Sequence, residues 1–512
     1  MRIYALFASL LSALTLSAQP ARAEWFEART THFNLITDAS EERARDFSSR
    51  LELFDAALRR LYGISDNPDL HNRPVTIYAL DPLVYFAVCR CRGSLGHYSR
   101  PVSGPRILVM SSQKADAKLK SGDLDSQALM LHEYSHHFMF TNFPGAYPYW
   151  YVEGFAEFNA NVAFRQDGSV VVGFPANYRG QALLGGSRLP LRKLVAPEQY
   201  GFGDNGDLIY GRAWLLTHYL MLRPERAGQL GRYLAAMRGG KPSLAAAQTA
   251  FGDFTALDRE LDAYMKGNLA PPLKISLPVA PAAASIRRLG KGEQAILISW
   301  LLMTDGVEWG YRKGPAMDAE KTARAYADDP VVQRRAAEVS LLADRLDQAN
   351  TSADRAIALE PASSEALVLK GRIAALRARA SAPKDNAAWA SGREWFRKAN
   401  LANPQAVEPF YRYYTSFAWA GIPPPTPAVH GLMRASVLAP ESLEIAVALA
   451  RQKLRENKPD EARSLLFPVA FAPHRPRDDN AAKQVISLID SGDLASATAS
   501  LEALEVKWRN PD

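Results

Sequence analysis

Short apolar runs alternate with a long amphipathic stretch in the first part of the chain. Residues 33–37, 74–80 and 106–111 are rich in branched and aromatic side chains, which favours β-strands. Between the first two runs, hydrophobic residues recur at helical spacing over 41–61. The pattern predicts a mixed α and β segment from residue 24 to about residue 112.

The hydrophobic spacing then becomes mainly helical. Residues 126–140, 151–164 and 210–222 each place apolar side chains at intervals of three and four. The stretch 268–285 that follows is rich in proline and alanine and poor in charge, so we expect a linker there. The pattern thus predicts a first domain over 24–267.

Everything beyond the linker, 286–512, is rich in alanine, leucine and arginine and is expected to be all helical. A pattern of helix, turn with proline, and helix recurs, with its prolines at Pro361, Pro404, Pro440 and, more weakly, Pro473. These prolines step by 43, 36 and 33 residues, which resembles the roughly 34-residue period of tetratricopeptide repeats. The resemblance covers about 329–504, and a generic helical domain with prolines at its turns is the alternative.

Composition and charge narrow the classes of function. With 512 residues, 47% hydrophobic and 22% charged, the chain is expected to fold into two or three domains. The net charge of +7 is modest, and the basic residues are scattered rather than clustered. No nucleic-acid partner is therefore expected.

The first 23 residues have the pattern of a signal peptide. Met1-Arg2 is followed by an apolar stretch, and Ala21-Arg22-Ala23 is a small-x-small cleavage pattern. We expect cleavage after Ala23 and a periplasmic or secreted protein. An uncleaved anchor is the alternative, but the apolar run is short for a bilayer, and no membrane span is expected after signal removal.

Only two cysteines are present, Cys89 and Cys91. In an oxidising compartment they could form a bridge, although a Cys-x-Cys ring is small and strained. Two reduced thiols are the equal alternative. Neither interpretation makes the cysteines catalytic.

The run His132-Glu133-Tyr134-Ser135-His136 lies in the predicted helix 126–140. Residues four apart share one helix face, so His132 and His136 can bind one ion. Glu133 lies about 100° round the helix, where it can reach a water near that ion and act as general base. Zinc in a catalytic site needs a third protein ligand and an open position.

A second predicted helix offers that third ligand. Glu153 stands in the run Trp150-Tyr-Val-Glu-Gly-Phe-Ala-Glu157, and it would complete a set of two histidines and one glutamate. Glu157 is one turn further along the same face, where it could hold the second N–H of a metal-bound histidine. A solvated carboxylate is the alternative for Glu157.

HExxH followed by W-x-x-E-G-x-A-E resembles the gluzincin zinc metallopeptidases, and most of all the peptidase MA-like proteins. The likeness covers roughly 25–267 and is specific around the two metal helices. It implies an α+β zincin-like metallopeptidase domain, with a mixed sheet, an HExxH helix and a helical lobe, followed by the all-α tetratricopeptide-like domain. It also implies one Zn²⁺ per chain, with Glu153 as its third ligand.

The same resemblance suggests a role for Tyr210. The aminopeptidase branch has a Tyr-Glu-Lys-Gly helix whose tyrosine steadies the oxyanion, and Tyr210-Gly-Arg-Ala is similar here. A helix-start tyrosine packed in the core is the alternative. The acidic residue by which aminopeptidases grip a free amine has no counterpart on 104–110, so an endopeptidase is weakly preferred. An edge strand at 106–111 could pair with an extended peptide.

Two functions from different classes follow. The first is an exported zinc peptidase, with Glu133 and Tyr210 as catalytic residues and a peptide or protein substrate. The second is a catalytically silent scaffold whose repeats bind a protein partner. Zinc content and the effect of changing Glu133 would separate them.

Overall fold

A computed structural model describes most of the chain. The residues described are 24–89, 94–111, 125–143, 145, 147–184, 188–197, 206–267, 269–278, 282–305, 309–381, 385–470 and 481–509. The expected signal peptide, Cys91 and Pro473 lie outside these residues.

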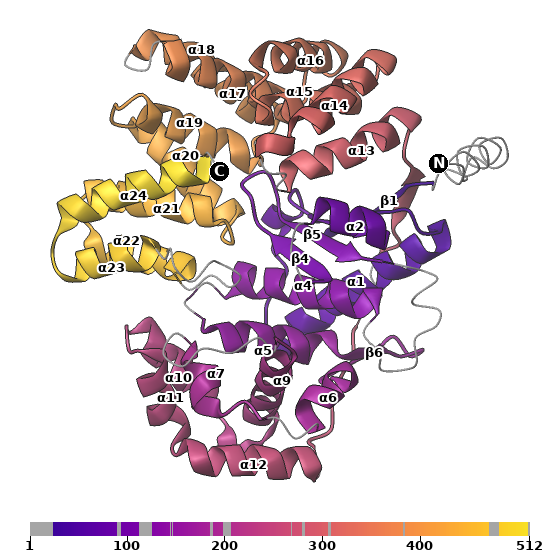
Figure 1. The fold of residues 1–512 in the computed structure, drawn as a ribbon, viewed down its shortest axis with the longest axis vertical. Coiled ribbons are helices and arrows are strands. Elements are labelled where there is room, and N and C mark those ends of the chain that lie inside the picture. Colours follow the sequence, from indigo (N-terminus) through magenta and orange to yellow (C-terminus); the bar gives the residue numbers. More distant parts are fainter. Residues whose placement is uncertain are drawn as a thin grey trace, which may run out of the picture.

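A six-stranded mixed sheet forms the centre of the N-terminal part (Figure 1). Its order is β4-β5-β3-β2-β1-β9, and β2, β3 and β5 run parallel while the other pairs are antiparallel. The strands are β1 (Phe26–Arg29), β2 (Phe33–Thr37), β3 (Val75–Leu80), β4 (Gly96–Ser99), β5 (Arg106–Met110) and β9 (Ser285–Arg288). The three predicted strands are β2, β3 and β5. The expectation that 106–111 is an edge strand is wrong, because β4 pairs with the outer side of β5.

The side chains on the two faces of this sheet belong to two different hydrophobic cores. On β3, Val75, Ile77 and Ala79 point into one core, whereas Tyr78 and Leu80 point into the other. This alternation is the period of two expected of a strand. Both faces of the sheet are therefore covered. Because the strands are buried on both sides, their sequences are continuous apolar runs.

Helix α1 (Glu41–Tyr62) and helix α4 (Ser126–Asn142) cover the first face. Residues next to α1 in the sequence determine both of its ends. Ser40 accepts the backbone N–H of Arg43 at the start, and Gly63 ends the helix with a left-handed φ of 66°. Below α4 in Figure 1 lies a helical lobe. It contains α5 (Tyr149–Ala160), η2 (Asn177–Arg179), α6 (Gly180–Leu184), α7 (Leu191–Val195), α9 (Gly206–Leu222), η3 (Pro224–Arg226), α10 (Gln229–Arg238), α11 (Ser243–Phe251) and α12 (Phe254–Lys266).

A small antiparallel sheet borders this lobe. Its strands are β6 (Val162–Phe164), β7 (Val170–Val172) and β8 (Leu273–Ile275). The predicted helix 151–164 is therefore too long, since α5 ends at Ala160. The side chain of Asn161 donates to the backbone oxygen of Glu157 at 2.6 Å, and the chain then pairs with β7.

The C-terminal part is helical, as predicted, and its helices pack in successive pairs. They are α13 (Lys291–Thr304), η4 (Trp309–Tyr311), α14 (Lys313–Ala325), α15 (Pro330–Leu342), α16 (Leu346–Leu359), α17 (Ser364–Ser381), α18 (Asn386–Ala402), α19 (Val407–Trp419), α20 (Thr426–Leu438), α21 (Leu443–Arg455), α22 (Pro459–Ala470), α23 (Ala481–Asp490) and α24 (Leu494–Arg509). Pro361, Pro404 and Pro440 each fall just after the second helix of a pair. The repeating helix pair expected from the proline spacing is thus confirmed for these copies.

The helical part packs against the second face of the sheet. Helix α13 buries Ile296, Leu297 and Trp300 in the core that also contains Tyr78 and Leu108, with α2 (Pro82–Val88) beside them. The stretch expected to be a linker, 268–285, contains β8 and reaches β9, so it is held by both sheets. In the described part of the chain, no helix is long and apolar enough to cross a membrane.

A second contact joins the helical repeats to the N-terminal part. Arg73, just before β3, pairs with Glu441 at 3.0 Å, and Glu444 accepts the backbone N–H of Val102 at 2.8 Å. Arg434 on α20 pairs with Asp69 at 3.2 Å in η1 (Pro68–Leu70). The two parts therefore share the apolar core beside α13 and, near α20 and α21, a second junction with polar contacts and with Val102 buried against the repeats.

Candidate metal centre

The HExxH run lies in the middle of α4, a helix fixed at its start by a cap and along one face by the core. Asp125 caps the helix by accepting the backbone N–H of Ala128 at 2.7 Å. Met130, Tyr134 and Phe138 fill the core beneath the sheet. The opposite face of the helix is thereby turned toward α5.

Helix α5 lies against α4 on one side and α9 on the other. Gly154 permits the second contact, because a Cβ there would lie 2.5 Å from the backbone oxygen of Ala213 and 2.2 Å from Oγ1 of Thr217. The close approach of α5 to α9 places Glu153 beside the two histidines of α4.

The structure brings His132, His136 and Glu153 together. Their ligand atoms all lie within 4.8 Å of one another. Glu153 Oε2 is 3.4 Å from Nε2 of His132 and 3.6 Å from Nε2 of His136. His136 and Glu153 are buried, and the His132 side chain is 13% exposed. Two imidazoles and one carboxylate, with one ligand still in reach of solvent, fit a catalytic zinc ion.

Glu133 is buried beside the edge strand β4. A Cβ at Gly96 would lie 2.6 Å from Oε1 of Glu133, so any other residue there would force this carboxylate to move. The sequence did not mark Gly96 as part of the site, because a lone glycine at the start of a short strand carries no distinguishing pattern.

Glu157 is fully buried, which excludes the alternative of a solvated carboxylate. Its Oε1 is 3.8 Å from Nδ1 of His132 and 2.8 Å from Nη2 of Arg179, and its Oε2 accepts the hydroxyl of Tyr178 at 2.6 Å. Arg179 and Tyr178 were not expected from the sequence, since they come from the short helix η2. Together they neutralise and fix a carboxylate that faces His132, and the role of Glu157 behind that histidine stays a prediction.

Tyr210 lies at the rim of the same group. Its ring centroid is 6.2 Å from that of His132, and the guanidinium of Arg179 lies 4.7 Å above its ring. The hydroxyl of Tyr149 lies 3.4 Å from that of Tyr210. The neighbouring Arg212 instead pairs with Asp258 and Asp262 on α12, at 2.6 and 3.3 Å, so it serves packing of the lobe.

The charges of the site act on its titratable groups. The negative charge of Glu153, together with burial, raises the pKa of Tyr210, so its phenol stays a hydrogen-bond donor at neutral pH. For His132, burial lowers the pKa, but Glu153, Glu157 and Glu133 together raise it above its ordinary value. The centre therefore favours positive charge.

Two further histidines near the motif are not part of the centre. His137 lies 3.0 Å from the hydroxyl of Tyr98, and burial lowers its pKa to about 4. His218 is held between the hydroxyl of Tyr264 at 2.8 Å and the backbone oxygen of Gly173 at 3.2 Å. His97 lies on β4 opposite Leu108, and no role is assigned to it.

Comparison with known proteins adds distant likenesses only. No protein-family model matches the chain, and no curated protein matches it. The crystal structure of TTC0263, a thermophilic TPR protein in Thermus thermophilus, is similar with a TM-score of 0.31 and 17% identity, over 41% of this chain and 99% of that chain. The crystal structure of yeast Tom70 is similar with a TM-score of 0.26 and 11% identity, over 89% and 84%. Likenesses this distant say nothing of the function of this chain.

Proposed function

We propose that the chain is a zinc-dependent peptidase of the gluzincin type, exported after loss of residues 1–23. The observation that carries the proposal is the convergence of His132, His136 and Glu153 within 4.8 Å, with the buried Glu133 on the same helix. These three residues would hold the ion. Zinc in such a set supplies a Lewis acid that polarises a carbonyl and acidifies water.

Residues of the chain would transfer the proton, stabilise the oxyanion and hold a metal ligand in place. Glu133 accepts a proton from the attacking water and returns it to the leaving amine. Tyr210 donates a hydrogen bond to the developing oxyanion, since a tyrosine phenol is protonated at neutral pH. Glu157 would keep the His132 ring in place, being itself held by Arg179 and Tyr178.

Zinc analysis and peptide cleavage of three proteins test this proposal. We expect about one zinc at this centre in the wild type and in Glu133→Ala, and none there in His132→Ala. Cleavage of a peptide library should fall by roughly 100-fold or more in Glu133→Ala, since general acid–base catalysis contributes that much.

The control is Glu225→Ala, because Glu225 is exposed in η3 and its change should alter neither zinc content nor cleavage. Cleavage that is equal in wild type and Glu133→Ala would contradict the catalytic role. Absence of zinc from a folded wild type would contradict the metal centre itself.

The helical repeats give a second candidate function, the binding of a protein partner or of the substrate. Met433 and Val437 lie one turn apart on α20, and their apolar side chains are 46% and 56% exposed. A partner that co-purifies with the double variant His132→Ala/His136→Ala, and is lost from Met433→Asp/Val437→Asp, would support a scaffold. Retention by both double variants would contradict binding through α20.

A further inference from the structure

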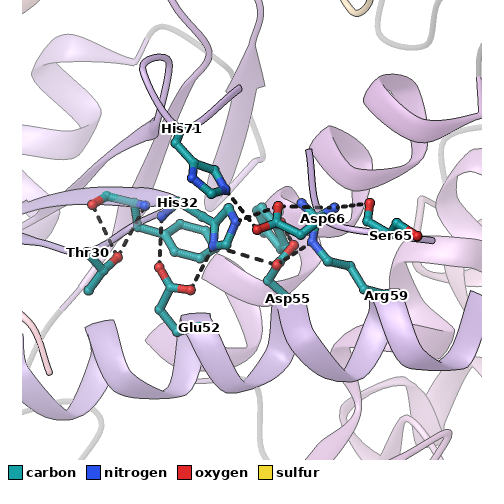
Figure 2. Close-up of polar contacts among 10 residues, drawn as sticks. Thr30, His32, Glu52, Asp55, Arg59, Ser65, Asp66 and His71 are labelled. Carbon is teal, nitrogen blue, oxygen red and sulfur yellow. Dashed lines mark hydrogen bonds and ion pairs between the residues drawn. The ribbon is translucent and has the colours of Figure 1, made fainter. Parts of the chain in front are cut away.

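A second group of possible ligands lies at one end of the large sheet, apart from the HExxH residues. His32 stands in the turn between β1 and β2, Asp66 in the loop after α1, and His71 directly after η1. Figure 2 shows the three side chains pointing toward one another. Their ligand atoms lie within 4.8 Å of one another, as those of the first centre do.

The carboxylate of Asp66 lies between the two imidazoles. Its Oδ1 is 3.1 Å from Nε2 of His32, and its Oδ2 is 2.8 Å from Nε2 of His71. The ligand atoms of tetrahedral zinc are about 3.3 Å apart, given bonds of about 2.0–2.1 Å. Only small side-chain shifts are therefore needed for one ion to take the place of the two hydrogen bonds.

The ring of His32 is held with Nε2 facing Asp66. Glu52 on α1 accepts from the backbone N–H of His32 and lies 2.8 Å from its Nδ1, with one oxygen for each contact. A carboxylate behind the distal nitrogen is the usual support of a metal-bound histidine. Figure 2 shows this arrangement, with Asp55 also near the ring.

The charges around the group favour a dication. Glu52, Asp55 and Asp66 supply three carboxylates, and Arg59 balances one charge, pairing with Asp55 at 2.6 Å and lying 3.8 Å from Asp66. Asp55 lies 3.7 Å from Nδ1 of His32, so two carboxylates, Asp55 and Glu52, stand behind this ring and a third, Asp66, in front of it. The carboxylates around the group thus favour a bound cation.

From this geometry we propose that His32, Asp66 and His71 bind a second metal ion, a first-row dication such as Zn²⁺. The His71 side chain is 31% exposed and that of Asp66 is 42% exposed, so water can complete the coordination. The ion joins the β1–β2 turn to the loop before β3. Asp69 in η1, two residues before His71, pairs with Arg434 of α20, so the proposed site lies beside the junction with the repeats.

The experiment measures zinc bound by the full chain in dialysis against micromolar Zn²⁺. In the background His132→Ala/His136→Ala, which removes the first centre, we expect about one zinc per chain. Adding His71→Ala should weaken this binding by at least about 100-fold, since one of three ligands is lost. Adding His430→Ala is the matched control, because His430 is an exposed histidine on α20 and should leave binding unchanged.

Binding in the otherwise unchanged chain covers the case in which the double variant does not fold. There His71→Ala should lower the zinc content from about two to about one per chain. Glu52→Gln should weaken the second site by roughly 10-fold or more, as loss of a supporting carboxylate does. Circular dichroism of each variant checks folding.

The outcomes separate this site from the proposed peptidase centre. One zinc per chain that is lost only on changing His132 and His136 overturns the second site and leaves the first intact. One zinc that is lost only on changing His71 supports the second site and overturns the first. Zinc binding in the double background that His71→Ala leaves unchanged also overturns the proposal.

Discussion

At the residue scale, Gly96 limits the space that is open to the side chain of Glu133. A methyl group at Gly96 would lie 2.6 Å from Oε1 and 2.9 Å from Cγ of Glu133, so the flexible carboxylate must move. In Gly96→Ala we expect the zinc content to stay and kcat to fall roughly 10-fold or more, because a general base must be within hydrogen-bond reach. Steady-state kinetics and metal analysis check this.

Gly314→Ala is the control for that substitution. Gly314 is in α14, and nothing lies within 4 Å of a Cβ placed there. Equal kcat in Gly96→Ala and wild type would contradict a position of Glu133 that depends on the space beside β4.

His218 is a second residue whose environment makes a measurable difference. Burial lowers its pKa to about 4, against about 6.5 in the unfolded chain. Between these values the unfolded chain binds the extra proton, so the free energy of unfolding rises with pH. We expect the metal-free protein to lose up to about 3 kcal/mol through this group as the pH falls from 7 to 4.

Urea unfolding of wild type and His218→Gln across pH 4–7, with chelator present, measures this contribution. The variant should be less stable at pH 7 and should show a smaller slope with pH. The other carboxylates and histidines are common to both proteins, so the difference between the slopes reports His218. Parallel pH profiles would contradict the assignment.

At the scale of elements, the contact between α5 and α9 determines where Glu153 lies. In Gly154→Ala the new Cβ would meet the backbone oxygen of Ala213 at 2.5 Å, and backbone cannot rotate away. We expect the two helices to separate, at a cost of about 1–3 kcal/mol in the free energy of unfolding. Displacement of Glu153 should weaken zinc binding as well.

Thermal unfolding of the metal-free protein and zinc titration together check this prediction. Gly231→Ala in α10 is the control, because nothing lies within 4 Å of its Cβ position. An unchanged melting temperature and zinc affinity in Gly154→Ala would mean that the α5–α9 spacing does not position the ligand.

At the scale of the whole molecule, the sheet depends on the helical part for half of its cover. Ile36, Tyr78 and Leu108 are buried on the face packed by α13, α14 and α15. A fragment ending at residue 284 would expose this face and would lack β9. We expect it to be insoluble or unfolded, because a large exposed apolar patch promotes aggregation.

The matching fragment ends at residue 345, after α15, and keeps every described member of that core. It should be markedly more soluble, with cooperative thermal unfolding. The measurement is the soluble yield and the unfolding curve of both fragments. A well-folded fragment ending at 284 would show that the N-terminal part is an independent domain.

Local patterns were sufficient to find many elements and the proposed ligands of the first centre. The helix 41–61 differs from α1 by one residue, because its cap, its apolar spacing and its final glycine are all adjacent in sequence. The proposed ligands His132 and His136 are one turn apart, and helical geometry alone brings them together. Glu153 required only one further assumption, that a second helix returns past the first.

Other features depended on contacts between distant segments, which no local period contains. Gly96 lies beside Glu133, Arg179 and Tyr178 bind Glu157, and His32 meets Asp66 and His71 only because separate loops converge. The same is true of β9, which pairs with β1 at the edge of the large sheet, and of α13, which covers the second face of that sheet. The sequence by itself determined the helices, several strands and the candidate zinc ligands, since these depend on near neighbours. Only the tertiary structure decided the surroundings of those ligands and the joining of the two parts, because side-chain packing between remote segments determines both.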